Sequence, residues 1–200
     1  MHISEGILNT PTLLATAAAG VALAAWSLRQ IDEAMLVKTA LLTAAFFLAG
    51  LIHVPIGPAN MHLSLLGVMG ILLGSRVFAA MAVALLLQAL LLQFGGLTAL
   101  GANLLIMSLP AFVCGWLFWR LEGRMPLWLR SFLTGALAVL LAATLAAGLL
   151  LLQGEGFWAA AGVLLVAHLP LAVVEGFVTL ALIGFLWRNR SSLLGADRAL

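Results

Sequence analysis

Apolar residues occur along this chain in long runs separated by short polar or charged breaks. A helix of about 20 apolar residues is long enough to cross a bilayer. Runs close to that length cover residues 11–28, 38–54, 60–75, 77–94, 97–119, 131–152 and 157–187. The pattern therefore predicts an all-α, polytopic membrane bundle of about seven transmembrane helices.

Proline interrupts two of these segments. Pro55 and Pro58 precede the third segment, which predicts irregular backbone over residues 52–60 at the membrane surface. Pro170 lies inside the last segment, where it predicts a break or kink just after His168.

Basic residues all fall in alternate loops of this arrangement. If the amino terminus is outside, the inner loops and the carboxyl-terminal tail hold all nine Lys and Arg residues: Arg29, Lys38, Arg76, Arg120, Arg124, Arg130, Arg188, Arg190 and Arg198. The positive-inside rule then predicts an outer amino terminus and a cytoplasmic carboxyl terminus. The expected domain organisation is a single integral membrane domain, with an outer segment at 1–10, a helical bundle at 11–187 and a cytoplasmic tail at 188–200.

Composition agrees with a membrane protein. Hydrophobic residues make up 64% of the 200 residues, charged residues 8%, and the mean hydropathy is +1.21. The basic balance is explained by topology, so we expect no nucleic-acid binding. The single cysteine, Cys114, lies in an apolar run and provides no disulfide or cysteine metal site.

The first two residues, Met1 and His2, form a chelator if Met1 keeps a free amine. Residues 1–10 contain no Lys or Arg, which is not typical of a signal peptide, and we expect Met1 to remain the amino terminus. The Met1 amine, the deprotonated His2 amide and the His2 imidazole close five- and six-membered rings around one metal. One further imidazole completes a square-planar nitrogen set, which suits Ni(II) or Cu(II), with Co(II) as a neighbour.

His62 is the expected fourth donor. It lies at the start of the third segment, on the same predicted outer surface as Met1 and His2. The expected supporting neighbours are His53, Asn103 and Ser64. His53 is also the competing donor to the metal, and helix-to-helix bonding is the other interpretation of Asn103. His168 and Glu175 are seven residues apart, and we expect a structural hydrogen bond between them.

Other functions are not favoured by the motifs. The chain has no His-Glu-x-x-His, no Gly-x-Ser-x-Gly and no nucleotide-binding loop. Alternatives that stay open are a binding component for a vitamin or similar organic molecule, an intramembrane hydrolase using Ser64 or Ser108, and a purely structural membrane partner.

Four ordered motifs resemble those of the CbiM/NikM family, the substrate-capture components of energy-coupling factor (ECF) transporters for cobalt and nickel. They are Met-His-Ile-Ser-Glu-Gly at 1–6, Gly-Pro followed by Met-His-Leu at 57–63, Gly-Gly-Leu-Thr-Ala-Leu-Gly-Ala-Asn at 95–103, and His-Leu-Pro-Leu-Ala-Val-Val-Glu-Gly at 168–176.

The resemblance implies a seven-helix, non-enzymatic subunit in the prokaryotic inner membrane that binds Co(II) or Ni(II) as cargo through Met1, His2 and His62. No intrinsic cofactor is expected. It further implies a transmembrane coupling subunit and cytoplasmic ATPases as partners, with a small accessory membrane subunit as an additional one.

Overall fold

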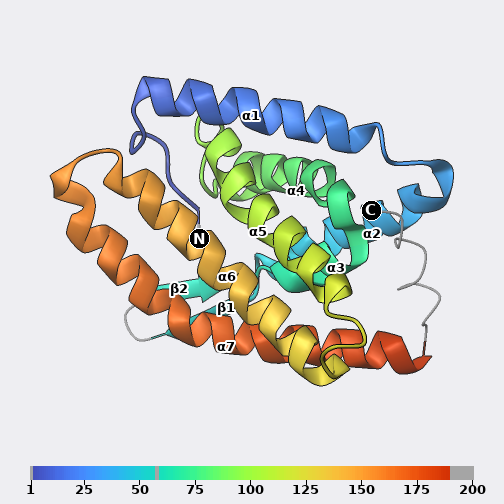
Figure 1. Cartoon of the computed structure of the whole chain (residues 1–200). Helices are drawn as coiled ribbons and strands as arrows, with labels where there is room; N and C mark the ends of the chain where they lie inside the picture. The colour runs from blue at the N-terminus through green and yellow to red at the C-terminus, as the bar shows by residue number, and fades with distance from the viewer. Residues whose placement is uncertain (1, 57–58, 190–200) are drawn as a thin grey trace.

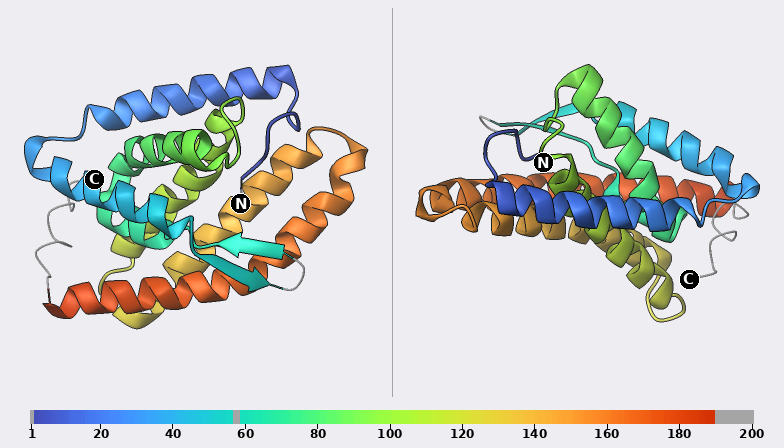
Figure 2. Two further views of the ribbon diagram at one scale, coloured as in Figure 1. Left: turned by 180° about the vertical axis from the view of Figure 1, so that it is seen from behind. Right: turned by 90° about the horizontal axis from the view of Figure 1, so that it is seen from above.

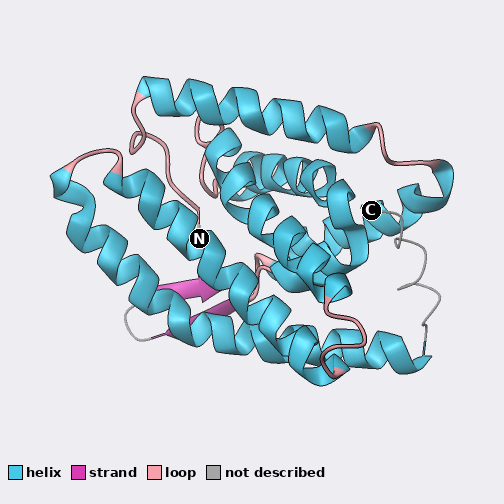
Figure 3. Cartoon of the chain, in the orientation of Figure 1, coloured by secondary structure: helices cyan, strands magenta, loops and turns pink. Residues whose placement is uncertain are grey.

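The computed structural model describes residues 2–56 and 59–189, and residues 53–61 only by their secondary structure. Met1 and the predicted tail beyond Asn189 lie outside the described residues. The helices and strands are α1 Thr10–Leu28, α2 Glu33–Ala49, β1 His53–Ile56, β2 Ala59–His62, α3 Leu66–Leu73, the 3-10 turn η1 Gly74–Arg76, α4 Val77–Leu92, α5 Leu100–Arg120, α6 Leu127–Leu151, the 3-10 turn η2 Glu155–Phe157, and α7 Trp158–Asn189 (Figure 3).

Helices α1 and α7 lie along opposite edges of the bundle (Figure 1). Between them, the short helix α3 is buried along its whole length and packs on α5, α6 and α7. The last two helices, α6 and α7, run side by side as the most extensively packed pair. The segment before α1 turns back between α1 and α6 toward the centre of the molecule, as both views in Figures 1 and 2 show. This return is what carries the start of the chain into the bundle.

Local sequence explains several helix starts. Asn9 caps α1, because its side chain accepts a hydrogen bond from the Thr12 N–H at 3.0 Å. Asp32 caps α2 in the same way, with the Met35 N–H at 2.8 Å. Helix α3 has no such local cap, since its N-cap residue is Leu65 in the left-handed conformation.

Five helical segments are long and apolar enough to cross a membrane: 10–28, 66–92, 100–120, 127–151 and 155–189. Their outer faces expose large apolar side chains such as Val21, Leu91 and Val166. Together these features indicate a multi-pass membrane protein, and the all-helical prediction is confirmed apart from one hairpin. The seven-span count is not confirmed, because α2 is not among the five segments and α3 and α4 fall within one of them.

The predicted third span, 60–75, differs most from the structure. Residues 53–56 and 59–62 form two antiparallel strands in which His53 pairs with His62, and the Leu63 N–H extends the pairing to the Ile52 carbonyl at 3.1 Å. The helix starts only at Leu66 and has eight residues, a length of about 12 Å that is too short to cross an apolar layer of about 30 Å. A proline-containing strand pair therefore replaces the irregular backbone expected there.

The last predicted segment was expected to break or kink at Pro170. Helix α7 contains Pro170 in its interior and continues without a break over 32 residues in all. The proline therefore does not end the helix.

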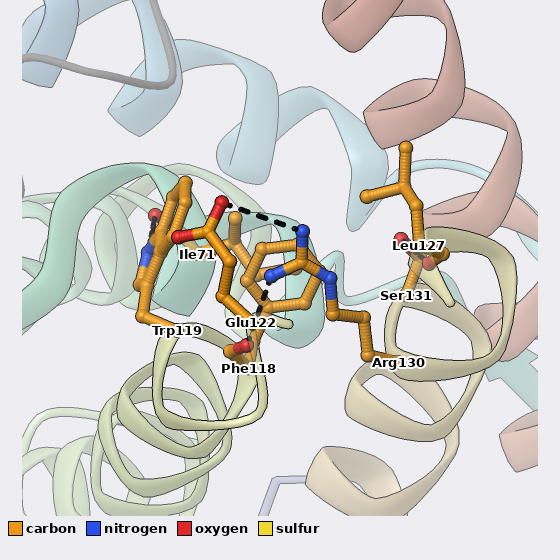
Figure 4. A network of polar contacts seen from close by, with 7 residues as sticks. All are labelled: Ile71, Phe118, Trp119, Glu122, Leu127, Arg130 and Ser131. Carbon is orange, nitrogen blue, oxygen red and sulfur yellow. Dashed lines mark hydrogen bonds and ion pairs between the residues drawn. The ribbon is translucent and has the colours of Figure 1, made fainter. Parts of the chain in front are cut away.

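Arg130, in the first turn of α6, contacts residues near the ends of α5 and α7. Figure 4 shows its contacts with the Phe118 carbonyl and with Glu122. Its guanidinium lies over the rings of Phe118 at 4.3 Å and Trp187 at 5.3 Å, donates to the Phe118 carbonyl at 3.3 Å, and pairs with Glu122 at 3.8 Å. Because Arg130 is only 4% exposed, these contacts replace the water that its charge would otherwise require.

Candidate metal centre

The structure brings His2 and His62 together. His2 Nδ1 lies 3.2 Å from His62 Nε2, and the two ring centroids are 5.0 Å apart. His62 Nδ1 lies 3.1 Å from the Leu63 carbonyl oxygen. A carbonyl can only accept a hydrogen bond, so this contact requires the proton on Nδ1 and leaves the Nε2 lone pair toward His2.

Phe94 forms an aromatic wall beside both imidazoles. Its ring stacks on His62 at 6.1 Å with an interplanar angle of 8°, and lies 6.0 Å from the His2 ring. Phe94 is the second residue after α4, and its N–H bonds to the Gln88 carbonyl. The turn after α4 therefore shields one side of the histidine pair.

Asn103, on α5, holds the residue that follows His2. Its Oδ1 accepts from the Ile3 N–H at 2.8 Å, and its Nδ2 donates to the Ile3 carbonyl at 3.0 Å. The close approach of residue 95 to Asn103 and His2 requires a glycine. Gly95 has φ +74°, and a Cβ there would lie 2.5 Å from Asn103 Nδ2 and 3.3 Å from His2 Cβ. Asn103 is 2% exposed, so both bonds are shielded from water.

Further contacts fix the rest of the amino-terminal segment. The Glu5 carboxylate accepts from the Thr98 N–H at 3.0 Å, and this bond holds the pKa of Glu5 below its usual range. The Asn9 N–H donates to Gln153 Oε1 at 2.8 Å. Ile3 and Leu8 are buried in the main apolar core. The segment is thus anchored to the bundle by both polar and apolar contacts.

Electrostatics favour a neutral His2. Burial lowers the pKa of His2 to about 3, the positive amino terminus and His62 act in the same direction, and the nearby Gln88 side chain acts against them. Gln88 is 1% exposed, and in the described part of the chain neither its side-chain amide nor His2 Nε2 has a partner of good hydrogen-bond geometry. Neutral imidazole is the form that binds metals.

Ser64, Glu175 and His168 are arranged differently from the expectation. Glu175 accepts from Ser64 and Leu65, whereas His168 Nδ1 lies 2.7 Å from the Leu164 carbonyl. The predicted His168–Glu175 bond is therefore wrong: a full helical turn of backbone offers His168 a nearer acceptor. Ser64 bonds to Glu175 rather than to an imidazole.

The described residues do not support the hydrolase interpretation, because neither Ser64 nor Ser108 donates its hydroxyl proton to a histidine. The Ser64 hydroxyl donates to Glu175, and the Ser108 hydroxyl donates to the Leu104 carbonyl one turn earlier in α5. Each hydroxyl proton is thus directed away from a histidine base.

Met1 lies outside the described residues. His53 is described by its backbone alone, which pairs with His62 in the neighbouring strand. Within residues 2–56 and 59–189, no group of three or more His, Cys, Asp or Glu side chains is suitable for holding a metal ion.

Sequence reasoning missed Phe94 and Gln88. Both belong to apolar or weakly polar stretches, in which a single phenylalanine or glutamine gives no motif. The only available signal was the position of Phe94 directly before Gly95 and Gly96, in an outer turn of the predicted topology.

A family model described as "Cobalt uptake substrate-specific transmembrane region" matches residues 2–193 of the chain. A Haemophilus influenzae protein that carries the name of a metal transport protein is 41% identical over 191 residues, covering 93% of each chain. The cobalt transport protein CbiM of Roseiflexus is 34% identical and covers 97% of this chain and 85% of its own length.

A solved structure of a metal transporter has a similar fold. The crystal structure of a transition metal transporter superposes with a TM-score of 0.81 at 26% sequence identity, covering 94% of this chain and 93% of the other.

Proposed function

Since the chain belongs to the CbiM family of cobalt uptake substrate-specific transmembrane regions, we propose that it captures Co(II) or Ni(II) through Met1, His2 and His62 for import. The observation that carries this proposal is the 3.2 Å approach of His2 Nδ1 to His62 Nε2. It supports one particular arrangement of four nitrogens.

A Met1–His2 chelate occupies three consecutive corners of a square: the amine, the deprotonated amide of His2 and His2 Nδ1. The fourth corner is then adjacent to Nδ1. With metal–nitrogen bonds of about 2.0 Å, adjacent corners lie about 2.8 Å apart. The separation of 3.2 Å between the two imidazole nitrogens needs only a small adjustment to meet this geometry.

The supporting contacts suit a preorganised chelate. Asn103 fixes the Ile3 peptide, Phe94 covers the imidazoles, and the buried His2 is neutral before any metal arrives. A site whose donors are already held in place loses less entropy on binding.

The proposal extends to the transport steps that the family resemblance and the distribution of basic residues predict. The protein takes up the hydrated ion at the outer face of the prokaryotic inner membrane, with its amino terminus outside and residues 188–200 inside. A transmembrane coupling subunit and cytoplasmic ATPases, joined by a small accessory membrane subunit where one is present, then drive the ion inward. The chain itself performs no catalysis and needs no resident cofactor.

The test is a calorimetric titration of Ni(II) and Co(II) into detergent-purified protein that carries only a carboxyl-terminal, histidine-free tag. A variant with one glycine added before Met1 is titrated beside it, because the extension moves the amine away from the His2 amide. Tight one-to-one binding that the extension abolishes is expected, with the same loss in His62→Ala. Binding that is indifferent to both changes would exclude this ligand set.

A further inference from the structure

Glu175 is a fully buried carboxyl group on α7 that the proposed ligand set does not use. Its relative exposure is 0%. Its Oε1 accepts hydrogen bonds from the Ser64 N–H, from the Ser64 hydroxyl at 2.8 Å and from the Leu65 N–H at 3.0 Å. Three donors from two consecutive residues therefore converge on one carboxylate oxygen.

The turn that Glu175 holds has a backbone conformation that needs support. Leu65 has φ 50° and ψ 25°, in the left-handed region that residues other than glycine seldom adopt. Leu65 is also the N-cap of α3, and its side chain makes no capping hydrogen bond. Glu175, 110 residues later in the chain, accepts from the N–H of this N-cap residue, as a Glu at position N3 does within one helix in a capping box.

His62 is attached to this same turn. Only Leu63 separates it from Ser64, and the Leu63 carbonyl accepts from His62 Nδ1 at 3.1 Å. The direction of the His62 Nε2 lone pair therefore depends on where Leu63 and Ser64 are held. A shift of the turn would move Nε2 away from His2.

We propose that Glu175 is a positioning residue for metal capture, which fixes the 63–65 turn so that His62 Nε2 faces His2 Nδ1. This inference rests on the proposed function. Hydrogen-bonding groups that orient metal ligands typically contribute ten- to hundredfold in affinity. The carboxylate connects α7 to the ligand-bearing turn. Helix α7 itself runs along one edge of the bundle (Figure 1).

The experiment titrates Ni(II) alone into the purified full-length protein and into Glu175→Ala and Glu175→Gln. Each titration is read by calorimetry and by the visible absorption spectrum of bound Ni(II), which reports the number of nitrogen ligands. We expect ten- to hundredfold weaker binding and a shifted spectrum in Glu175→Ala. Glu175→Gln should recover much of both, because its amide oxygen can still accept from Ser64 and Leu65.

Thr179→Val is the matched control. Thr179 lies one turn further along α7, is 0% exposed, and its hydroxyl has no hydrogen-bond partner within the described residues. The substitution disturbs packing between α7 and α3 without touching the turn, and metal affinity should stay at the wild-type value. Equal weakening in Thr179→Val and Glu175→Ala would overturn the positioning role, and so would a Glu175→Ala protein with wild-type affinity and spectrum.

If Glu175→Ala cannot be purified in folded form, Ser64→Ala decides. It removes one of the three donors to Glu175, and binding about threefold weaker or more is expected; wild-type affinity in Ser64→Ala overturns the proposal. A wild-type protein that binds no Ni(II), or a His62→Ala protein that binds as tightly as wild type, refutes the proposed function itself and is recognised separately.

Discussion

The side-chain amide of Asn103 bonds to both the N–H and the carbonyl of Ile3, at 2.8 and 3.0 Å. These two bonds hold the peptide groups on both sides of the Ile3 Cα, because the N–H belongs to the His2–Ile3 peptide and the carbonyl to the Ile3–Ser4 peptide. Since Ile3 directly follows His2, this amide sets the direction in which the start of the chain enters the bundle.

Asn103→Ala should weaken Ni(II) binding about ten- to hundredfold, because the chelating residues lose their support. It should also lower the free energy of unfolding by about 1–3 kcal/mol, since the Ile3 N–H and carbonyl would stay buried without partners. Calorimetric titration and thermal unfolding in detergent measure the two effects.

The control for Asn103 is Ser108→Ala on the same helix. The Ser108 hydroxyl bonds only within α5, to the Leu104 carbonyl, and its loss should leave metal affinity unchanged. If Asn103→Ala binds Ni(II) as wild type does, the proposed importance of the two Asn103–Ile3 bonds for metal binding is refuted.

Gln88→Leu should weaken metal binding by a smaller factor, about three- to tenfold. The Gln88 amide is the polar group beside His2, and an acceptor for the second imidazole N–H holds the ring with Nδ1 free for the metal. The comparison is Gln88→Glu, whose carboxylate is a stronger acceptor and should raise the pKa of His2. Titration of the His2 ring by NMR checks this direction, and an unchanged pKa would show that the side chain at 88 does not reach the imidazole.

Arg130→Met should reduce stability without changing metal affinity. The substitution removes a cation from the rings of Phe118 and Trp187 and a bond to the Phe118 carbonyl, which together stabilise the fold by about 2–4 kcal/mol. Its partner Glu122 is 38% exposed, so their ion pair adds little. Thermal unfolding and Ni(II) titration of the same sample separate the two properties, and Arg130→Lys should restore only part of the stability because its ammonium lacks the planar fork.

The sequence predicted the helical class and most helix positions, because runs of apolar residues bounded by charge and glycine determine them. It did not predict the 53–62 hairpin. The alternation of apolar and polar residues there is too short to distinguish a strand from the start of the following helix, and only the pairing of His53 with His62 reveals it.

The candidate site was predictable as far as its chemistry was local. The Met1 amine and His2 are adjacent in the sequence, as the proposed chelate requires, and His62 and Asn103 are polar residues in otherwise apolar stretches. Glu175 was assigned to the wrong partner, since a spacing of seven residues in one helix says nothing about a turn 110 residues away. Contacts of this kind depend on how the helices pack.

Metal affinity should rise with pH, and the slope should identify the groups that release protons. Burial lowers the pKa of His2 to about 3, so its imidazole is already neutral at pH 7 and releases no proton. Because folding disfavours the charged form of His2, the metal-free protein should lose stability as the pH falls from about 6.5 toward 3.

The Met1 amine, with an ordinary pKa of about 7.7–8.0, and the His2 amide must each release one proton when the metal binds. The logarithm of the association constant should therefore rise by about two per pH unit near pH 7 and by about one near pH 9, as measured by calorimetry in buffers of different ionisation enthalpy. A protein acetylated at Met1 should show no such tight binding, and a flat profile between pH 7 and 9 would exclude both main-chain nitrogens as ligands.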